Sequence, residues 1–309
     1  MTPTPIILDC DPGHDDAIAI LLALASPEIE LLGVTTVSGN QTLDKTTANA
    51  LRVLELAGRG DIPVYAGADA PFVRKRDVAA HVHGESGLDG PELPAPSKPQ
   101  QPQHGVEYLA EQFRGHDKPV LVATGPLTNI GLLFATHVDA RPERIVLMGG
   151  AIGEGNRTPA AEFNIWADPE AAQRVFAENL DTTMVGLDAT HRALITDEHT
   201  ERMRGAGKVG KVVAELMDFY ARFHKQRYPD LPGSPMHDPV CIAHLIDPTL
   251  LDVRDAFIEV DCTTGPSWGR TNVDWRNRDH FGDPNAKVAL DIDGERFAEL
   301  IVERISALR

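Results

Sequence analysis

Four carboxylates lie close together near the amino terminus: Asp9, Asp11, Asp15 and Asp16. An apolar run at residues 6–8 predicts a buried strand, and a longer apolar run from Ala17 predicts a packed helix. A strand, a tight turn and a helix are how a doubly wound sheet begins, and such sheets bind ligands at the carboxyl ends of their strands. The acids are therefore expected at a binding site.

These acids need a counter-charge that the neighbouring sequence does not supply. Capping of the following helix by Asp15 or Asp16 accounts for one of them or two. The others raise one another's pKa or repel unless a positive charge lies among them, and His14 is the one basic residue nearby. Oxygen ligands favour a hard cation, calcium or magnesium, over zinc. We therefore predict a metal site rather than a capped helix with solvated acids.

Charge and composition exclude several classes of partner. The chain has 29 Lys and Arg against 46 Asp and Glu, a formal net charge of −17, which repels nucleic acid and anionic membranes. Its longest apolar run is too short for a membrane span of about 20 residues. The amino terminus lacks the pattern of a signal peptide, and the three cysteines form no paired framework. We therefore expect a cytoplasmic protein with a neutral or cationic small ligand, no nucleic acid and no membrane.

Strand-like and helix-like segments alternate along the chain. Strands are expected at 29–37, 63–65, 119–123, 144–148, 182–187, 256–261 and 286–290, and helices at 42–58, 106–113, 209–223, 237–245 and 294–308. This alternation is typical of βαβ units. The predicted fold class is α/β, with a single doubly wound, mostly parallel sheet and helices on both faces. No linker or repeat divides residues 1–309, so a single domain is expected.

Two irregular stretches contain histidines. Residues 66–103 are rich in proline, glycine and charge, and a loop this long is usually functional or disordered. For His81 and His83 within it, a surface position is favoured over metal binding. Residues 224–236 are interpreted either as a lid over a bound ligand or as a plain surface connection.

Further polar residues occur before two expected helices. Glu162 and Asn164 are two positions apart, so an extended segment would point both one way and Phe163 the other, which suits two contacts to one small ligand. Asp168 precedes a proline and is expected to cap a helix. Asp238 also precedes a proline, so a capping role remains open for it beside a functional one.

The residues predicted at the carboxyl ends of the strands form an acidic set, which favours one reaction type. It contains no Ser-His-Asp arrangement, no cysteine in a basic setting and no Walker loop, and the glycines at 149–155 lack dinucleotide-binding spacing. Fixed negative charge stabilises a positive transition state, such as the oxocarbenium-like state of glycosidic cleavage. A metal held by the same acids would lower the pKa of a bound water.

The stretch D-C-D-P-G-H-D-D-A at 9–17 resembles the amino-terminal signature of the nucleoside hydrolases, the inosine/uridine-preferring ribohydrolase family. The likeness continues in V-S-G-N-Q-T (37–42), H-G-E-S-G (83–87), A-T-G-P-L-T-N (123–129), V-L-M-G-G (146–150), A-E-F-N-I (161–165) and H-D-P (237–239). One acidic motif is weak evidence, whereas seven blocks in the family's order cover most of the chain. The resemblance implies the Rossmann-like nucleoside hydrolase fold.

The resemblance also implies an activity: hydrolysis of the N-glycosidic bond of ribonucleosides to free base and ribose, with one Ca²⁺ per subunit. Asp11, Asp16 and Asp238 would bind the calcium together with the backbone carbonyl of Thr124. Asp11 would also take the proton from the metal-bound water, and His237 would assist departure of the base. Members of the family are usually dimers or tetramers, so a homo-oligomer is expected.

The resemblance implies a set of substrate contacts as well. Asp15 and Asn164 would hold ribose hydroxyls, Glu162 and Asn156 would hold the 5′ side, and Asn40 would lie near the sugar. The residues implied around the rest of the pocket are His83, Met148, Phe163, Tyr220 and His224. Because His224 stands where some members have a tyrosine, the preference for purine or pyrimidine stays open.

Two other functions compete with this one. A haloacid-dehalogenase-like phosphatase would use Asp9 as nucleophile and Asp11 as acid, but Pro12 replaces the expected Thr or Val, and Asp15 and its neighbour would repel a phosphate. A non-catalytic protein that binds nucleoside or calcium is the second alternative. The presence of both Asp11 and His237 argues against it.

Overall fold

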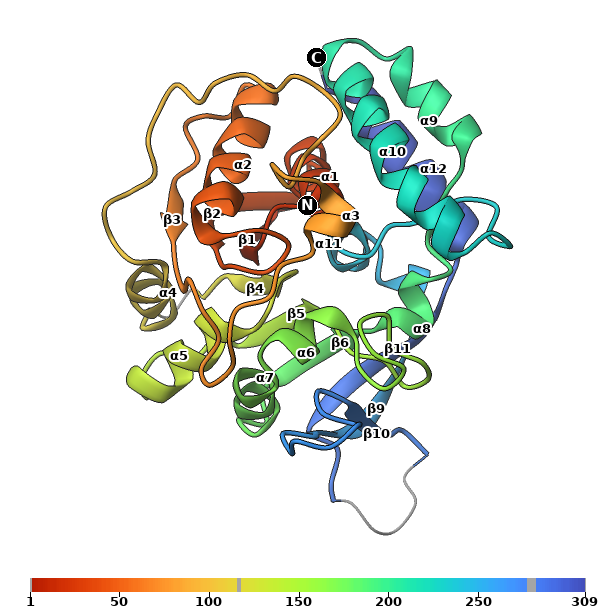
Figure 1. The fold of residues 1–309 in the computed structure, drawn as a ribbon. Helices are drawn as coiled ribbons and strands as arrows, with labels where there is room; N and C mark the ends of the chain where they lie inside the picture. The colour runs from red at the N-terminus through yellow and green to blue at the C-terminus, as the bar shows by residue number, and fades with distance from the viewer. Residues whose placement is uncertain (1, 116–117, 277–281, 309) are drawn as a thin grey trace.

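A nine-stranded sheet forms the centre of the computed structural model, which describes residues 2–115, 118–276 and 282–308 (Figure 1). The strand order is β10-β9-β11-β6-β5-β4-β1-β2-β3. The strands are β1 (Thr4–Cys10), β2 (Ile29–Thr36), β3 (Val64–Ala66), β4 (Val120–Ala123), β5 (Arg144–Met148), β6 (Asp181–Val185), β9 (Leu251–Val260), β10 (Thr271–Asp274) and β11 (Ala286–Ile292). All pairs from β3 to β11 are parallel, and β9 and β10 add two antiparallel pairs. The predicted mostly parallel α/β sheet is confirmed.

Helices cover both faces of this sheet and enclose two apolar cores (Figure 1). One face carries α1 (His14–Ala25), α2 (Leu43–Leu56), α10 (Lys208–Arg227), α11 (Pro239–Ile246) and α12 (Gly294–Ala307). The other carries α4 (Gly105–Phe113), α5 (Thr128–Thr136), α6 (Phe163–Ala167) and α7 (Pro169–Phe176). The remaining elements are α3 (Ala80–His83), α8 (Leu187–Thr190), α9 (Asp197–Arg204), η1 (Pro248–Leu250) and the small pair β7 (Leu194–Ile195) and β8 (Ser234–Pro235). None of the described helices has the length and apolar character needed to cross a membrane.

The strand β1 and the helix α1 form the buried centre of the fold. β1 lies between β2 and β4, and α1 is buried from His14 to Ala23. A helix that is apolar on all sides packs between other elements, and α1 contacts α2, α10, α11 and α12. Cys10 is fully buried among the apolar residues of this core, so it contributes to packing.

Three local expectations were wrong. Residues 162–164 are not extended, because Glu162 caps α6 with its own side chain and the following residues are helical. The helix expected at 209–223 continues to Arg227, so His224 lies on α10 and not in a loop. His83 is buried in the short helix α3 rather than at the surface, because the stretch that contains it packs against the start of α1.

Candidate active site

Buried carboxylates gather where β1 ends and α1 begins. Asp15, Asp16 and Asp238 each place a carboxylate oxygen within 4.8 Å of the other two. Asp238 precedes α11, which packs against α1 and so brings this distant residue to the amino-terminal acids. It occupies the N-cap position of α11, yet its side chain makes no capping hydrogen bond. Its carboxylate is therefore free to face the cluster.

Asp11 lies in the same buried region, at the end of β1. Its Oδ2 accepts a hydrogen bond from the backbone N–H of Asn40 at 2.6 Å, whereas its Oδ1 has no partner among the described residues. Oδ1 of Asp15 likewise has none. Buried carboxylate oxygens without donors are costly, so these two atoms indicate that a ligand completes the site.

Asp16 is the most extensively bonded acid of the cluster. Its Oδ2 accepts from the N–H of Gly13 at 3.0 Å and from Nδ2 of Asn40 at 3.1 Å, and its Oδ1 accepts from the hydroxyl of Thr124 at 2.8 Å. Three segments distant in sequence are thereby joined at one carboxylate. As expected, Asp16 also supports the start of α1, because Gly13 is the N-cap residue of that helix.

Burial and mutual repulsion disfavour the ionised form of these acids. Burial, and to a smaller extent the nearby charge of Asp16, raise the pKa of Asp15 to about 7. Burial and Asp16 likewise raise the pKa of Asp11, and burial and Asp15 raise that of Asp238. A divalent cation would favour the ionised form of all of them.

A second group of residues builds the opposite wall of the site. Glu162 accepts from the N–H groups of Gly150, Asn164 and Ile165 at 2.9, 2.9 and 3.1 Å, and burial raises its pKa to about 7. Nδ2 of Asn164 donates to the backbone carbonyl of Thr124 at 2.9 Å. The amide and carboxylate of this wall are therefore fixed in place by backbone groups.

Histidines and aromatic residues form the third side. Nδ1 of His237 lies 2.8 Å from the hydroxyl of Thr190, and Nδ1 of His83 lies 3.2 Å from the backbone N–H of His14. The ring centroids of Tyr220 and His224 are 4.1 Å apart on α10. Burial lowers the pKa of His237 and His83 well below the ordinary value and that of His224 to about 4. These rings are therefore neutral hydrogen-bonding groups at neutral pH.

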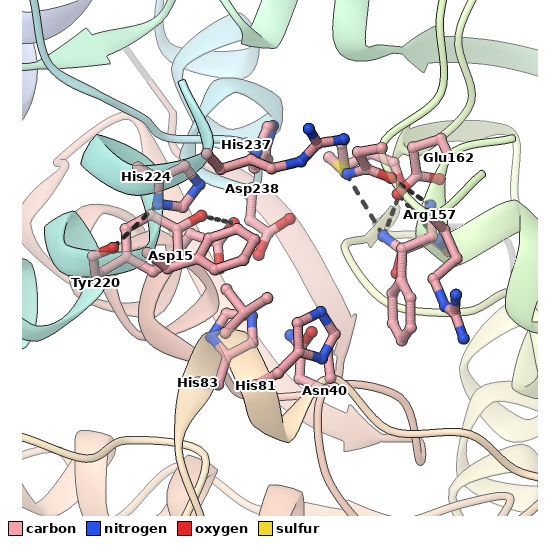
Figure 2. Close-up of a pocket in the computed structure, with 18 of the residues that line it drawn as sticks. Asp15, Asn40, His81, His83, Arg157, Glu162, Tyr220, His224, His237 and Asp238 are labelled. Atoms are coloured by element: carbon pink, nitrogen blue, oxygen red, sulfur yellow. Dashed lines mark hydrogen bonds between the residues drawn. The ribbon is translucent and has the colours of Figure 1, made fainter. Parts of the chain in front are cut away.

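The three groups line one cavity (Figure 2). Asp15 and Asp238 lie between the histidine side and the wall that carries Glu162 (Figure 2). The structure places at the cavity lining the predicted residues Asp15, Asn40, His83, Thr124, Met148, Asn156, Glu162, Phe163, Asn164, Tyr220, His224, His237 and Asp238. Asp11 and Asp16 are fully buried beneath the lining.

Sequence reasoning missed part of the lining. Arg157, Phe223, Arg227 and Tyr228 also line the cavity. The guanidinium of Arg157 pairs with Asp77 and lies over the ring of Trp166, so it joins two loops beside the cavity. No motif marked Arg157, and Phe223 was expected only as part of a helix. Arg227 and Tyr228 belong to the stretch 224–236 that was interpreted as a lid or as a plain surface connection.

Comparison with known proteins defines the class. Residues 6–299 match the family described as inosine-uridine preferring nucleoside hydrolase. A pyrimidine-specific ribonucleoside hydrolase RihA from Shewanella sp. (strain ANA-3) is 53% identical over 98% of this chain and 96% of its own length. The RihA protein of Citrobacter koseri is 48% identical over 98% of both chains. The structure of a purine-preferring ribonucleoside hydrolase from Gardnerella vaginalis superposes with a TM-score of 0.92, at 35% identity and 98% coverage of both chains.

Fold, site and relatives together define a ribonucleoside hydrolase, an enzyme that hydrolyses N-glycosidic bonds. The chain belongs to the inosine-uridine preferring nucleoside hydrolase family. The resemblance seen in the seven sequence blocks is thus confirmed. The comparisons do not favour the phosphatase or the non-catalytic binding protein.

Proposed function

We propose that this enzyme hydrolyses pyrimidine ribonucleosides, uridine and cytidine, to the free base and ribose. The observation that carries the proposal is the cavity itself, in which buried acids face one side of a ligand and neutral histidines face another. The preference for pyrimidines is supported by the relatives at 53% and 48% identity, which are named pyrimidine-specific. The more distant purine-preferring structure is 35% identical.

We propose one Ca²⁺ per subunit, held by Asp11, Asp16, Asp238 and the backbone carbonyl of Thr124. The donor set fits this ion, because it consists of oxygens and includes the unpartnered Oδ1 of Asp11. Asp15 belongs to the same carboxylate cluster and adds negative charge. When bound, a calcium ion supplies Lewis-acid chemistry that lowers the pKa of a coordinated water and orients it.

Asp11 is proposed as the general base. Its Oδ1 receives no hydrogen bond from the described residues, so this oxygen is available to accept a proton. The backbone N–H of Asn40 donates to Oδ2 of Asp11 at 2.6 Å. This hydrogen bond fixes the carboxylate and therefore the direction of its Oδ1. Asp11 would accept the proton that the attacking water gives up.

Polar residues on two walls are proposed to hold the ribose. Asp15 and Asn164 would bind the 2′ and 3′ hydroxyls, and Glu162 and Asn156 would bind the 5′ side. Asn40 would contact the sugar from the β2 side. All five line the cavity, and the carboxylates among them would stabilise the positive charge that develops on the sugar ring.

The histidine side is proposed to hold the base. His237 would donate a hydrogen bond to the departing base, while Tyr220, His224 and Phe163 would pack around the base beside His83 and Met148.

We also propose that the chain forms a single domain, assembles as a dimer or tetramer and works in the cytoplasm.

A panel of ribonucleosides and deoxyribonucleosides, scored for sugar release with and without chelator, tests this function. Uridine and cytidine should be hydrolysed fastest, chelator should stop the reaction, and added calcium should restore it. p-Nitrophenyl phosphate serves as the control for phosphatase activity. Absence of free base from every ribonucleoside in millimolar calcium would overturn the proposal.

A further inference from the structure

Thr190 makes a hydrogen bond to His237 but does not itself line the cavity. It is the last residue of α8, and it is fully buried. Its hydroxyl oxygen lies 2.8 Å from Nδ1 of His237, which precedes α11. This hydrogen bond joins two segments distant in sequence at the Nδ1 edge of the imidazole.

The direction of this hydrogen bond follows from asking which of its two groups, the hydroxyl of Thr190 or Nδ1 of His237, supplies the hydrogen. Within the described parts of the chain, the hydroxyl of Thr190 makes its hydrogen bond with Nδ1 of His237 and with no other group. If Nδ1 carried the hydrogen, the hydroxyl hydrogen would be buried without an acceptor, which is unfavourable. If the hydroxyl donates, both groups are satisfied. In the neutral ring the hydrogen then lies on Nε2.

We propose that Thr190 is a positioning residue that holds the His237 ring with its Nε2–H directed into the cavity. This inference rests on the proposed function. As the bond between C1′ and the base nitrogen breaks, its electron pair moves onto the base, and the Nε2–H hydrogen bond stabilises that negative charge. Without the hydroxyl, the ring can carry its hydrogen on Nδ1 or rotate, and the base then loses this donor.

Thr190→Val tests the role, because valine keeps the shape of the side chain and removes the hydroxyl. With uridine and saturating calcium, we expect kcat to fall by about 10- to 100-fold and KM to change by less than about 3-fold. Thr190→Ser retains the hydroxyl and should keep kcat within about 3-fold of the wild-type value. Equal losses in both variants, or an unchanged kcat in Thr190→Val, would overturn the proposal.

Thr182→Val is the matched control. Thr182 lies on β6, and its buried hydroxyl has no hydrogen-bond partner among the described residues. Removing it deletes a buried hydroxyl without touching His237, so kcat should stay at the wild-type value. A fall equal to that of Thr190→Val would show that loss of any buried hydroxyl is sufficient, and would overturn the positioning role.

A second readout is independent of turnover. In protein labelled with ¹⁵N-histidine, with His237 assigned by its loss in His237→Ala, the wild-type ring should show a protonated Nε2. The Thr190→Val ring should show a mixture of both tautomers, and an unchanged pattern would overturn the inference. If the wild-type enzyme releases no base at all, the proposed function fails, while this spectrum still decides whether Thr190 sets the tautomer.

Discussion

At the scale of single residues, burial sets the charge state of the site. The same exclusion of water that raises the pKa of Asp11, Asp15 and Asp238 lowers the pKa of His83 and His237. Both effects favour the neutral form, as expected in a medium of low dielectric. All of these acids can be ionised at once only if a cation lies among them. The histidines need no counter-ion, because they are neutral.

Replacing the proposed base should stop the reaction at the chemical step. Asp11→Ala removes the proposed proton acceptor and one proposed calcium ligand, so kcat for uridine should fall by about 10²- to 10⁴-fold and calcium should bind more weakly. Steady-state kinetics and calorimetric titration with calcium measure the two effects. Asp69→Ala, on an exposed loop residue, is the control. Activity close to wild type in Asp11→Ala would rule out its assigned role.

Replacing His237 should separate chemistry from metal binding. His237→Ala removes the donor to the base but none of the proposed calcium ligands, so kcat should fall by about 10²-fold or more while calcium affinity stays near the wild-type value. The same kinetic and calorimetric measurements apply. Loss of calcium binding in this variant would show that His237 has been given the wrong role.

At the scale of elements, helix starts and strand ends assemble the site. The acids lie at the amino-terminal ends of α1 and α11, where the helix dipoles partly favour negative charge. Glu162 caps α6 while also facing the cavity. By contrast, Asp168 caps α7 and does not line the cavity, so we assign it a structural role.

Loss of the Asp168 side chain should weaken the fold without changing the chemistry. Its oxygens accept from the N–H of Ala171 at 3.1 Å, the hydroxyl of Thr128 at 2.7 Å and the N–H of Phe72 at 3.0 Å. Asp168→Ala should lower the free energy of unfolding by about 1–3 kcal/mol, measured in urea, because three donors lose their acceptor. At 25 °C kcat should change little. A large fall in kcat with unchanged stability would contradict this assignment.

At the scale of the whole molecule, the buried acids link stability to pH and metal. Burial raises the pKa of Asp15 and of Glu162 to about 7 in the folded protein. In an unfolded chain these groups have pKa values of about 3.9 and 4.3. The folded protein therefore binds more protons between those values and about 7, so their contribution to stability is fully present below about pH 4 and is lost as the pH rises through 7.

Removal of metal should expose this dependence. In chelator, the Tm should fall between pH 5.5 and pH 8, because the clustered carboxylates become charged without a counter-ion. Calcium should raise the Tm more at pH 8 than at pH 5.5. At 100 times its Kd, calcium should add about 2.7 kcal/mol to the free energy of unfolding. Differential scanning calorimetry measures both trends. A Tm at pH 8 that calcium does not change would contradict the proposed metal site.

Much of the fold could be predicted because local patterns specify element types. The strand predicted at 144–148 coincides with β5, and the helix predicted at 294–308 is α12. The antiparallel strand β10 and the helix α9 were not predicted. β10 is short and, among the described strands, pairs with β9 alone. α9 has few apolar residues, so neither element leaves a clear periodic signal.

The sequence by itself determined that the chain is an α/β protein with an acidic site after its first strand, and its ordered motifs indicated the family. Tertiary structure alone decided that Asp238 joins Asp16, that Glu162 accepts a hydrogen bond from the N–H of Gly150, and that Thr190 contacts His237. The physical reason is the separation in sequence over which each kind of interaction acts. Periodicity and capping act within a few residues, whereas these contacts depend on the order of the strands and on α11 packing against α1.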